Sequence, residues 1–239
     1  MLQRETPTSQ QGRRYRPPGR ETTVPWSAGG AELPSQLSLV GDLNLFVAGD
    51  LELLGCRRVS VIGARDASEA GLRRAAKLAR TLASAGVVVV AGLARGIDRA
   101  AHEAAISAGG RTIAVIGTPL DRCYPAEHAT LQEAVYREHL LVSQFPSGAP
   151  VRAANFPKRN RVMAMLSDAS VIVEAGDSSG SLSQAAETQR LGKPVFLMRS
   201  LVENSALSWP AAFLRKGAIV LDDARQVLEA LGHGRGAIL

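Results

Sequence analysis

The chain has 239 residues, a net charge of +6 and 46% hydrophobic residues, enough for one large domain or a domain with appendages. No apolar run approaches the roughly 18 residues of a membrane span, and residues 1–20 lack the apolar core of a secretory signal. The two cysteines, Cys56 and Cys123, form neither a disulfide framework nor a metal-like spacing, which favours a reducing cytoplasm and no metal.

Residues 1–33 hold most of the positive charge. Five arginines within residues 1–20 face a single glutamate, a net charge of +4, so the rest of the chain carries only +2 of the total. The segment is rich in Pro, Gly, Gln, Ser and Thr, which predicts a disordered basic arm. It is either a solvated tail or an accessory arm that binds a polyanion. Residues 34–55 are expected to form a short helical or irregular lead-in.

From residue 57 the pattern alternates between short apolar runs and helical spacing. The β-branched run 57–64 predicts a buried strand, and 68–86 predicts a helix with Ser68 as N-cap and Gly86 as its stop. Further strands are expected at 87–92, 111–117, 169–174, 194–198 and 218–221. Helices are expected at 96–110, at 127–138 (leading to the apolar segment 140–145), and at 181–192, 207–216 and 222–231.

Strands with nearly continuous apolar runs, separated by helices, predict a mostly parallel sheet with helices on both faces. The fold class is therefore α/β, a doubly wound, Rossmann-like domain over residues 34–232, followed by a flexible tail at 233–239. Ligands of such sheets bind beyond the carboxyl ends of the strands. Glycine-containing loops at 62–65, 91–98, 116–125 and 174–181 follow the strands and suit phosphate, although a single such loop also serves as a tight turn.

The signatures of common nucleotide and hydrolase sites are missing. The segment GARDASEAG after the first strand has the wrong spacing for a dinucleotide fingerprint, and neither a P-loop nor a G-x-S-x-G elbow occurs. The four histidines form no pair at metal-ligand spacing, and His102 is expected to be a partly buried helix residue. Because no catalytic constellation is visible, we expect a binding protein without a cofactor rather than an enzyme.

The segment FPKRNR at 156–161 places three cations within four residues, directly before an apolar helix and strand. Pro157 stiffens the approach, and Asn160 is the expected N-cap of a helix that begins near Arg161. Lys158 and Arg159 then oppose the helix dipole, a mismatch of about 0.3–1 kcal/mol each that a bound anion neutralises. A solvated turn, or ion pairs with acids elsewhere, is the alternative. The pattern favours an anion site.

Several motifs occur together and in one order: VIGARDAS, AGLARGIDRAAHEAAISAGG, a Tyr-Pro pair after the third strand, FPKRNR and SGSL. In this combination residues 35–225 resemble the DprA/Smf family of DNA-processing proteins. The resemblance implies a Rossmann-like protein that binds single-stranded DNA and acts in natural transformation and recombination. It also implies loading of a RecA-type recombinase and a homodimer, without enzymatic turnover.

The resemblance further assigns the site. Arg65 and Lys158 are expected to grip phosphates, with Arg159 in the same basic cluster. The pocket is expected to be shaped by Gly63, Gly92, Gly96, Asn160, Arg161, Ser179, Gly180 and Ser181. The candidates for base stacking are Tyr124, Phe145 and Phe156. Two features depart from the family: Ala64 replaces the usual Ser or Thr, and the segment 198–217 is altered, so the face for dimer and recombinase contacts is expected to differ.

An enzyme on the same fold is the alternative. The LOG phosphoribohydrolases are similar Rossmann-like proteins with the signature P-G-G-x-G-T-x-x-E. The stretch EAGDSSGSLSQAAE sits at the corresponding strand end and places Glu187 seven residues after Gly180, although PGG-x-GT itself is absent. A LOG-like or nucleotide-ligand-binding protein therefore stays open, as does a divergent scaffold whose pocket binds nothing.

Overall fold

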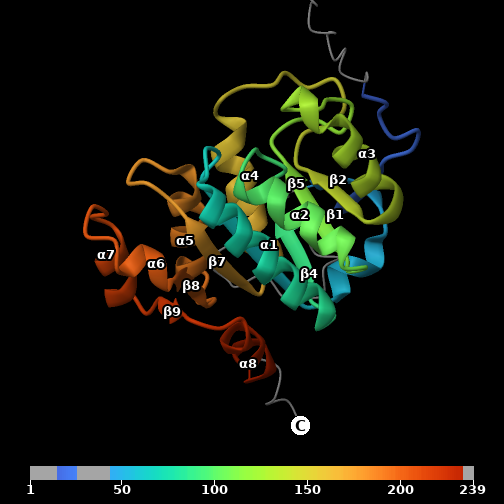
Figure 1. Cartoon of the computed structure of the whole chain (residues 1–239). Coiled ribbons are helices and arrows are strands. Elements are labelled where there is room, and N and C mark those ends of the chain that lie inside the picture. Colours follow the sequence, from blue (N-terminus) through green and yellow to red (C-terminus); the bar gives the residue numbers. More distant parts are fainter. Residues whose placement is uncertain (1–14, 26–43, 234–239) are drawn as a thin grey trace, which may run out of the picture.

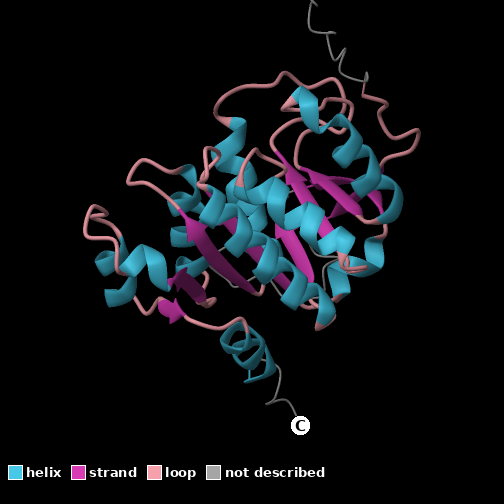
Figure 2. Cartoon of the chain, in the orientation of Figure 1, coloured by secondary structure: helices cyan, strands magenta, loops and turns pink. Residues whose placement is uncertain are grey.

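The computed structural model describes residues 15–25 and 44–233, and these residues form a mostly parallel sheet with helices on both faces (Figures 1 and 2). The strands are β1 (Thr22–Pro25), β2 (Asn44–Gly49), β3 (Arg58–Gly63), β4 (Val88–Ala91), β5 (Thr112–Ile116), β6 (Leu140–Ser143), β7 (Ala169–Glu174), β8 (Val195–Met198) and β9 (Ile219–Leu221). The helices are α1 (Glu69–Ser84), α2 (Ile97–Ser107), α3 (Ala129–Glu138), α4 (Asn155–Leu166), α5 (Gly180–Arg190), α6 (Arg199–Val202), α7 (Pro210–Arg215) and α8 (Arg225–His233). Two 3-10 turns, η3 (Leu51–Gly55) and η4 (Ala126–His128), complete the described elements.

The strand order explains where a ligand can enter. Along the sheet the order is β1-β2-β6-β5-β4-β3-β7-β8-β9, with β2 antiparallel to β1 and β6 and all other pairs parallel. From β3 the chain builds outward to β6, then returns through α4 to add β7 on the other side of β3. The carboxyl ends of β3 and β7 therefore form a topological switch point, where open α/β sheets bind ligands.

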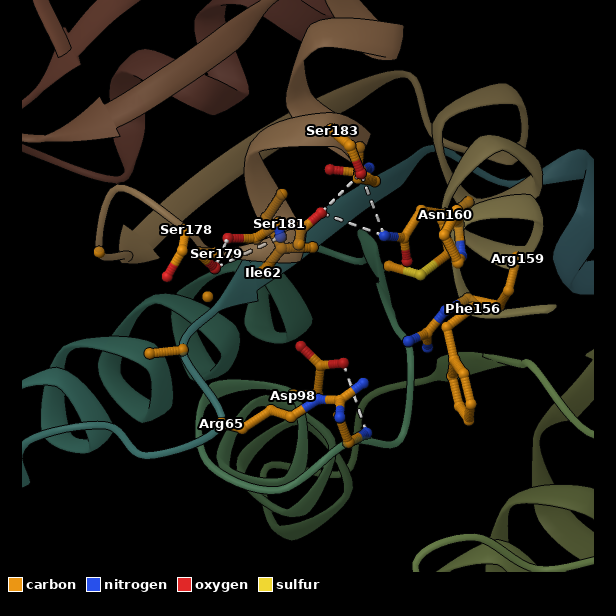
Figure 3. Close-up of a pocket in the computed structure, with 18 of the residues that line it drawn as sticks. Ile62, Arg65, Asp98, Phe156, Arg159, Asn160, Ser178, Ser179, Ser181 and Ser183 are labelled. Atoms are coloured by element: carbon orange, nitrogen blue, oxygen red, sulfur yellow. Dashed lines mark hydrogen bonds between the residues drawn. The ribbon is translucent and has the colours of Figure 1, made fainter. Parts of the chain in front are cut away.

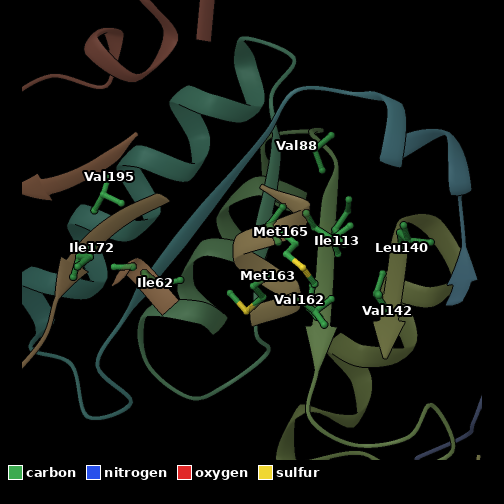
Figure 4. Packing of buried hydrophobic residues seen from close by; sticks show 14 of the residues in the cluster. Ile62, Val88, Ile113, Leu140, Val142, Val162, Met163, Met165, Ile172 and Val195 are labelled. Atoms are coloured by element: carbon green, nitrogen blue, oxygen red, sulfur yellow. The ribbon is translucent and has the colours of Figure 1, made fainter. Parts of the chain in front are cut away.

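The core lies on both faces of the sheet. Val59 and Val61 of β3 pack toward α1, α2 and α8, whereas Ile62 of the same strand packs toward α4 and α5. Figure 4 shows this second layer, in which Val162 and Met163 of α4 lie among side chains of the sheet. The predicted doubly wound α/β class is confirmed, because the alternating apolar strands can be covered only by helices on both sides.

Local signals set most element boundaries. The Ser68 hydroxyl accepts a hydrogen bond from the backbone N–H of Gly71, so it caps α1 as predicted. Gly86 follows the helix with a φ of +73°, the left-handed conformation that ends helices. His102 is fully buried rather than partly buried: its Nδ1 lies 2.7 Å from Thr112 Oγ1, and burial lowers its pKa to about 3.

Two predictions for the amino-terminal part are wrong. Residues 15–25 are ordered: β1 pairs with β2, the Tyr15 hydroxyl donates to the Leu120 carbonyl (2.7 Å), and the Arg16 amide donates to Glu133 (2.9 Å). Residues 44–49 form a strand instead of a helical or irregular lead-in. Both segments gain their order from partners distant in the chain, which composition does not reveal. The rest of the predicted arm (1–14 and 26–33) and residues 234–239 of the predicted tail lie outside the described residues.

Within the described ranges, no helix is both long and apolar enough to cross a membrane.

Candidate functional site

A cavity of about 530 Å³ lies at the switch point, between the loops after β3 and β7 and the first turns of α4 (Figure 3). Its size suits a ligand as large as a nucleotide. Seven of the predicted site residues line it: Gly63, Arg65, Arg159, Asn160, Ser179, Gly180 and Ser181. The other four, Gly92, Gly96, Lys158 and Arg161, do not line this cavity.

The turn after β3 presents Arg65 at the cavity. Arg65 is exposed, and its guanidinium carbon lies 5.5 Å from the centre of the Phe156 ring. Gly96 packs against this turn, and a Cβ at Gly96 would collide with the carbonyl groups of Ala64 and Arg65. Its φ of +70° also favours glycine. Gly96 is therefore a packing residue, which holds the Arg65 backbone rather than contacting a ligand.

The helices that begin after β3 and β7 differ in how their N-termini are satisfied. Glu174 fills the N-terminus of α1: it accepts hydrogen bonds from the Ser68 amide (2.7 Å) and hydroxyl (2.6 Å) and from Arg74 (3.2 Å). This is the position where a dinucleotide phosphate lies in other Rossmann-like folds, so α1 has no room for one. By contrast, α5 begins at Gly180 in the cavity with no acidic residue in its first turn. The α5 N-terminus is the one that attracts anions.

The start of α4 differs from the prediction. The helix begins at Asn155, so Asn160 lies inside it and is not its N-cap. Proline is tolerated in a first helical turn, which is why Pro157 did not mark an entry loop. The Asn160 amide instead donates to the Gly180 carbonyl (3.1 Å) and ties α4 to α5. Lys158 is exposed, and Arg161 is exposed beside Glu187 at 3.6 Å.

Arg159 points into the protein. Its side chain is only 5% exposed, and its Nη1 donates to the carbonyl oxygens of Gly92 and Val115, at the ends of β4 and β5. Gly92 has no side chain because a Cβ would collide with this guanidinium. Burial lowers the pKa of Arg159, while the nearby Asp98 opposes that shift. The expectation of a solvent-facing phosphate ligand is therefore corrected: Arg159 braces the floor of the cavity.

Asp98 is a functional candidate that the sequence motifs do not indicate. It is 7% exposed, and its Oδ2 accepts hydrogen bonds from the amides of Gly92 (3.0 Å) and Ala94 (3.4 Å). Burial raises the pKa of its carboxyl group, and the charge of Arg159 opposes that rise. A buried carboxylate is unexpected beside an anion-attracting rim. The signal for it in the sequence is its place in the Gly-Ile-Asp stretch of the second glycine-containing loop.

An aromatic pair borders the cavity. The rings of Tyr124 and Phe156 lie 5.5 Å apart, and Tyr124 is 53% exposed. Together with Arg65, Arg95 and Gly92 they line a small recess of about 50 Å³. Phe145, the third stacking candidate, lines neither the cavity nor this recess. The arrangement offers a cation and an exposed ring side by side, which suits phosphate and base in one nucleotide.

Among the residues that the structure describes, no group of three or more His, Cys, Asp or Glu is placed to hold a metal ion.

The fold and cavity define a Rossmann-like α/β protein with an anion-attracting pocket at its switch point. Residues 29–232 match the family model described as DNA recombination-mediator protein A, and the chain belongs to that family. Protein Smf of Escherichia coli (strain K12) is 39% identical over 155 residues, which cover 64% of this chain and 41% of that protein. The chain thus spans well under two thirds of this relative.

Two solved structures of DNA processing protein A are similar over most of the chain. The protein from Streptococcus pneumoniae superposes with a TM-score of 0.74 at 35% identity, covering 82% of this chain and 70% of that one. The protein from Helicobacter pylori also gives a TM-score of 0.74, at 28% identity, covering 90% of this chain and 97% of that one.

Proposed function

We propose that this protein binds single-stranded DNA in the switch-point cavity and acts in DNA processing and recombination. The observation that carries the proposal is the cavity rim, which holds the exposed Arg65 and the N-terminus of α5, whose first turn has no acidic residue. Membership of the recombination-mediator family supports it, as does the similar Helicobacter pylori protein, whose structure is described in terms of its single-stranded DNA binding mode.

The rim suits a chain of phosphates better than one tightly enclosed anion. Arg65 and Lys158 are both exposed; Arg65 lies over the ring of Phe156, and Lys158 follows Phe156 by two residues in the first turns of α4. The exposed Tyr124 ring adds a stacking surface beside them. Proteins that bind single strands combine such cationic tracks with aromatic platforms, and their affinity falls steeply with salt.

Fluorescence anisotropy with a labelled single-stranded oligonucleotide tests the proposal. We expect Arg65→Ala and Lys158→Ala each to weaken binding at least about tenfold, and to lower the slope of log affinity against log salt by roughly 0.7. Arg80→Ala is the matched control, because Arg80 is an exposed arginine of α1 that does not line the cavity. Unchanged binding by the Arg65 and Lys158 double variant, or equal binding of duplex, would contradict the assignment.

Finer roles follow from the family membership. We propose that the protein acts in natural transformation, in the cytoplasm, as a homodimer that loads a RecA-type recombinase. The two free cysteines suit a reducing compartment. Light scattering measures the dimer directly. Loading is measured as strand exchange by the recombinase on DNA coated with a single-strand-binding protein, and no stimulation would remove this role.

The hydrolase alternative gains no support from the geometry. Glu187, its candidate carboxylate, lies 2.6 Å from Arg190 and 3.6 Å from Arg161 and does not line the cavity. In the signature P-G-G-x-G-T-x-x-E the acid follows the last glycine by four positions. Counted from Gly180, that position is Gln184, which does line the cavity and whose amide cannot act as an acid or base.

A further inference from the structure

The cavity has two zones of opposite character. Its rim carries the guanidinium of Arg65 and the N-terminus of α5, both of which attract anions. Its floor carries the carboxylate of Asp98, which repels them. A ligand that only supplied phosphate would gain nothing from this acid. The floor therefore suits a part of the ligand that donates hydrogen bonds.

The two oxygens of Asp98 have different environments. Oδ2 is committed to the loop, because it accepts from the amides of Gly92 and Ala94. Figure 3 shows the other oxygen turned toward the open space of the cavity, below the serines of α5. A carboxylate held by one oxygen and open at the other is a fixed hydrogen-bond acceptor, since its rotation would break both loop contacts.

A donor lies beside this acceptor. Asp98 and Arg159 bind the same residue, Gly92, one at its N–H and the other at its carbonyl, and the two side chains are close enough for their charges to interact. The Nε of Arg159 is buried and has no hydrogen-bond partner among the described residues, and the Arg159 residue also lines the cavity. Ile62 and Met163 supply apolar wall around the two polar groups.

We propose that Asp98, with Arg159 beside it, reads the Watson–Crick edge of one unpaired nucleobase inserted into the cavity. This inference rests on the proposed function and names what selects single strands. Each of the four bases carries, on its Watson–Crick edge, an N–H next to an acceptor. An acceptor beside a donor therefore takes any base, but only when its pairing edge is free. In duplex DNA that edge is occupied, and the base cannot enter.

A chemical change in the DNA tests the inference without altering the protein. Oligothymidylate and the same oligomer methylated at every N3 carry equal backbone charge, but the methyl group removes the only N–H of thymine. We expect the wild-type protein to bind the methylated oligomer about 10- to 100-fold more weakly, as for loss of a hydrogen bond to a charged acceptor. Equal affinities would overturn the inference while leaving the proposed function intact. No binding of either oligomer would overturn both.

Protein variants then locate the effect. In Asp98→Asn the side-chain oxygen can still accept from Gly92 and Ala94, while the amide nitrogen replaces the acceptor in the cavity. We expect the preference for the unmethylated oligomer to fall at least fivefold. Asp66→Asn is the matched control, because Asp66 is an exposed acid of the rim, and this variant should bind both oligomers more tightly at an unchanged ratio.

The Arg65→Ala variant distinguishes phosphate binding at the rim of the cavity from base recognition at its floor. It should weaken the binding of both oligomers equally and leave the ratio of the two affinities unchanged. A ratio that follows Arg65 instead of Asp98 would place base reading at the rim and contradict the inference. Circular dichroism of Asp98→Asn checks its fold, and the comparison of the two oligomers on the wild-type protein decides the question even if that variant does not fold.

Discussion

Arg159 is held by acceptors of the protein itself. It is one of three cations in four residues, yet its neighbours in sequence, Lys158 and Arg161, are exposed while Arg159 donates to the carbonyls of Gly92 and Val115. Its position on α4 turns it toward the sheet, where these carbonyls and Asp98 compensate its burial. The basic segment therefore has two structural roles: one arginine makes buried hydrogen bonds, and the cations on either side of it lie at the surface.

Arg159→Met should destabilise the fold by about 2–4 kcal/mol, because two buried carbonyls lose their donor and the buried Asp98 carboxylate loses a nearby positive charge. Urea unfolding followed by circular dichroism measures the change. Arg161→Met is the matched control and should change stability by less than about 0.5 kcal/mol, since its pair with Glu187 is half-exposed. Equal stability of the two variants would show that Arg159 is not braced as described.

At the scale of elements, α4 is fixed at its middle and at its end. In its middle Asn160 ties it to α5, through the Gly180 carbonyl. At its end Lys193 donates to three carbonyl oxygens, those of Ala164 (3.1 Å), Met165 (2.7 Å) and Ser167 (2.7 Å). The last carbonyls of a helix have no partner within it, so a cation there satisfies several at once. The helix that carries the basic segment is thus held in a fixed position over the sheet.

Lys193→Met should therefore lower the free energy of unfolding by about 1–3 kcal/mol, because three partly buried carbonyls lose their donor. Thermal unfolding measures the loss. Lys216→Met provides the comparison, since Lys216 is exposed and its side chain has no part in these contacts. If both variants melt at the wild-type temperature, the cap contributes nothing to the stability of α4.

At the scale of the molecule, residues 15–25 form a strap across one end of the sheet. β1 extends the sheet beyond β2, and the strap is held to α3 by the hydrogen bond from the Tyr136 hydroxyl to the Arg16 carbonyl (2.9 Å). The Tyr15 hydroxyl reaches Leu120, in the same loop that carries Tyr124 of the aromatic pair. Figure 1 shows this segment beside β2 and α3, far from α8.

Removal of residues 1–25 should lower the unfolding free energy by about 2 kcal/mol or more, because several hydrogen bonds of about 0.5–1.5 kcal/mol each are lost together. Removal of residues 1–14 alone is the control, because it keeps all of these hydrogen bonds, and it should lower stability less than the longer truncation. Chemical denaturation compares the two truncations, and equal stability would show that the strap is not part of the folded unit.

Local signals in the chain were sufficient to predict much of the fold. The N-cap at Ser68, the stop at Gly86 and the apolar run of β7 depend on neighbours a few residues away, so their positions could be predicted closely. β2 and β1 could not, because each is ordered by pairing with a partner distant in the chain. The start of α4 was missed for a related reason: Asn155 is buried by the fold, and no local cap marks it.

The sequence by itself determined the α/β class, the loops that surround the cavity and the family, because strand and helix periods and motif order are properties of the chain alone. Only the tertiary structure decided what each polar residue does. It turned Arg159 inward, placed Glu174 on the N-terminus of α1, and set the buried Asp98 in the same cavity as Arg65. The direction of a side chain depends on which strands lie beside it, and that is set when β7 returns to pair with β3.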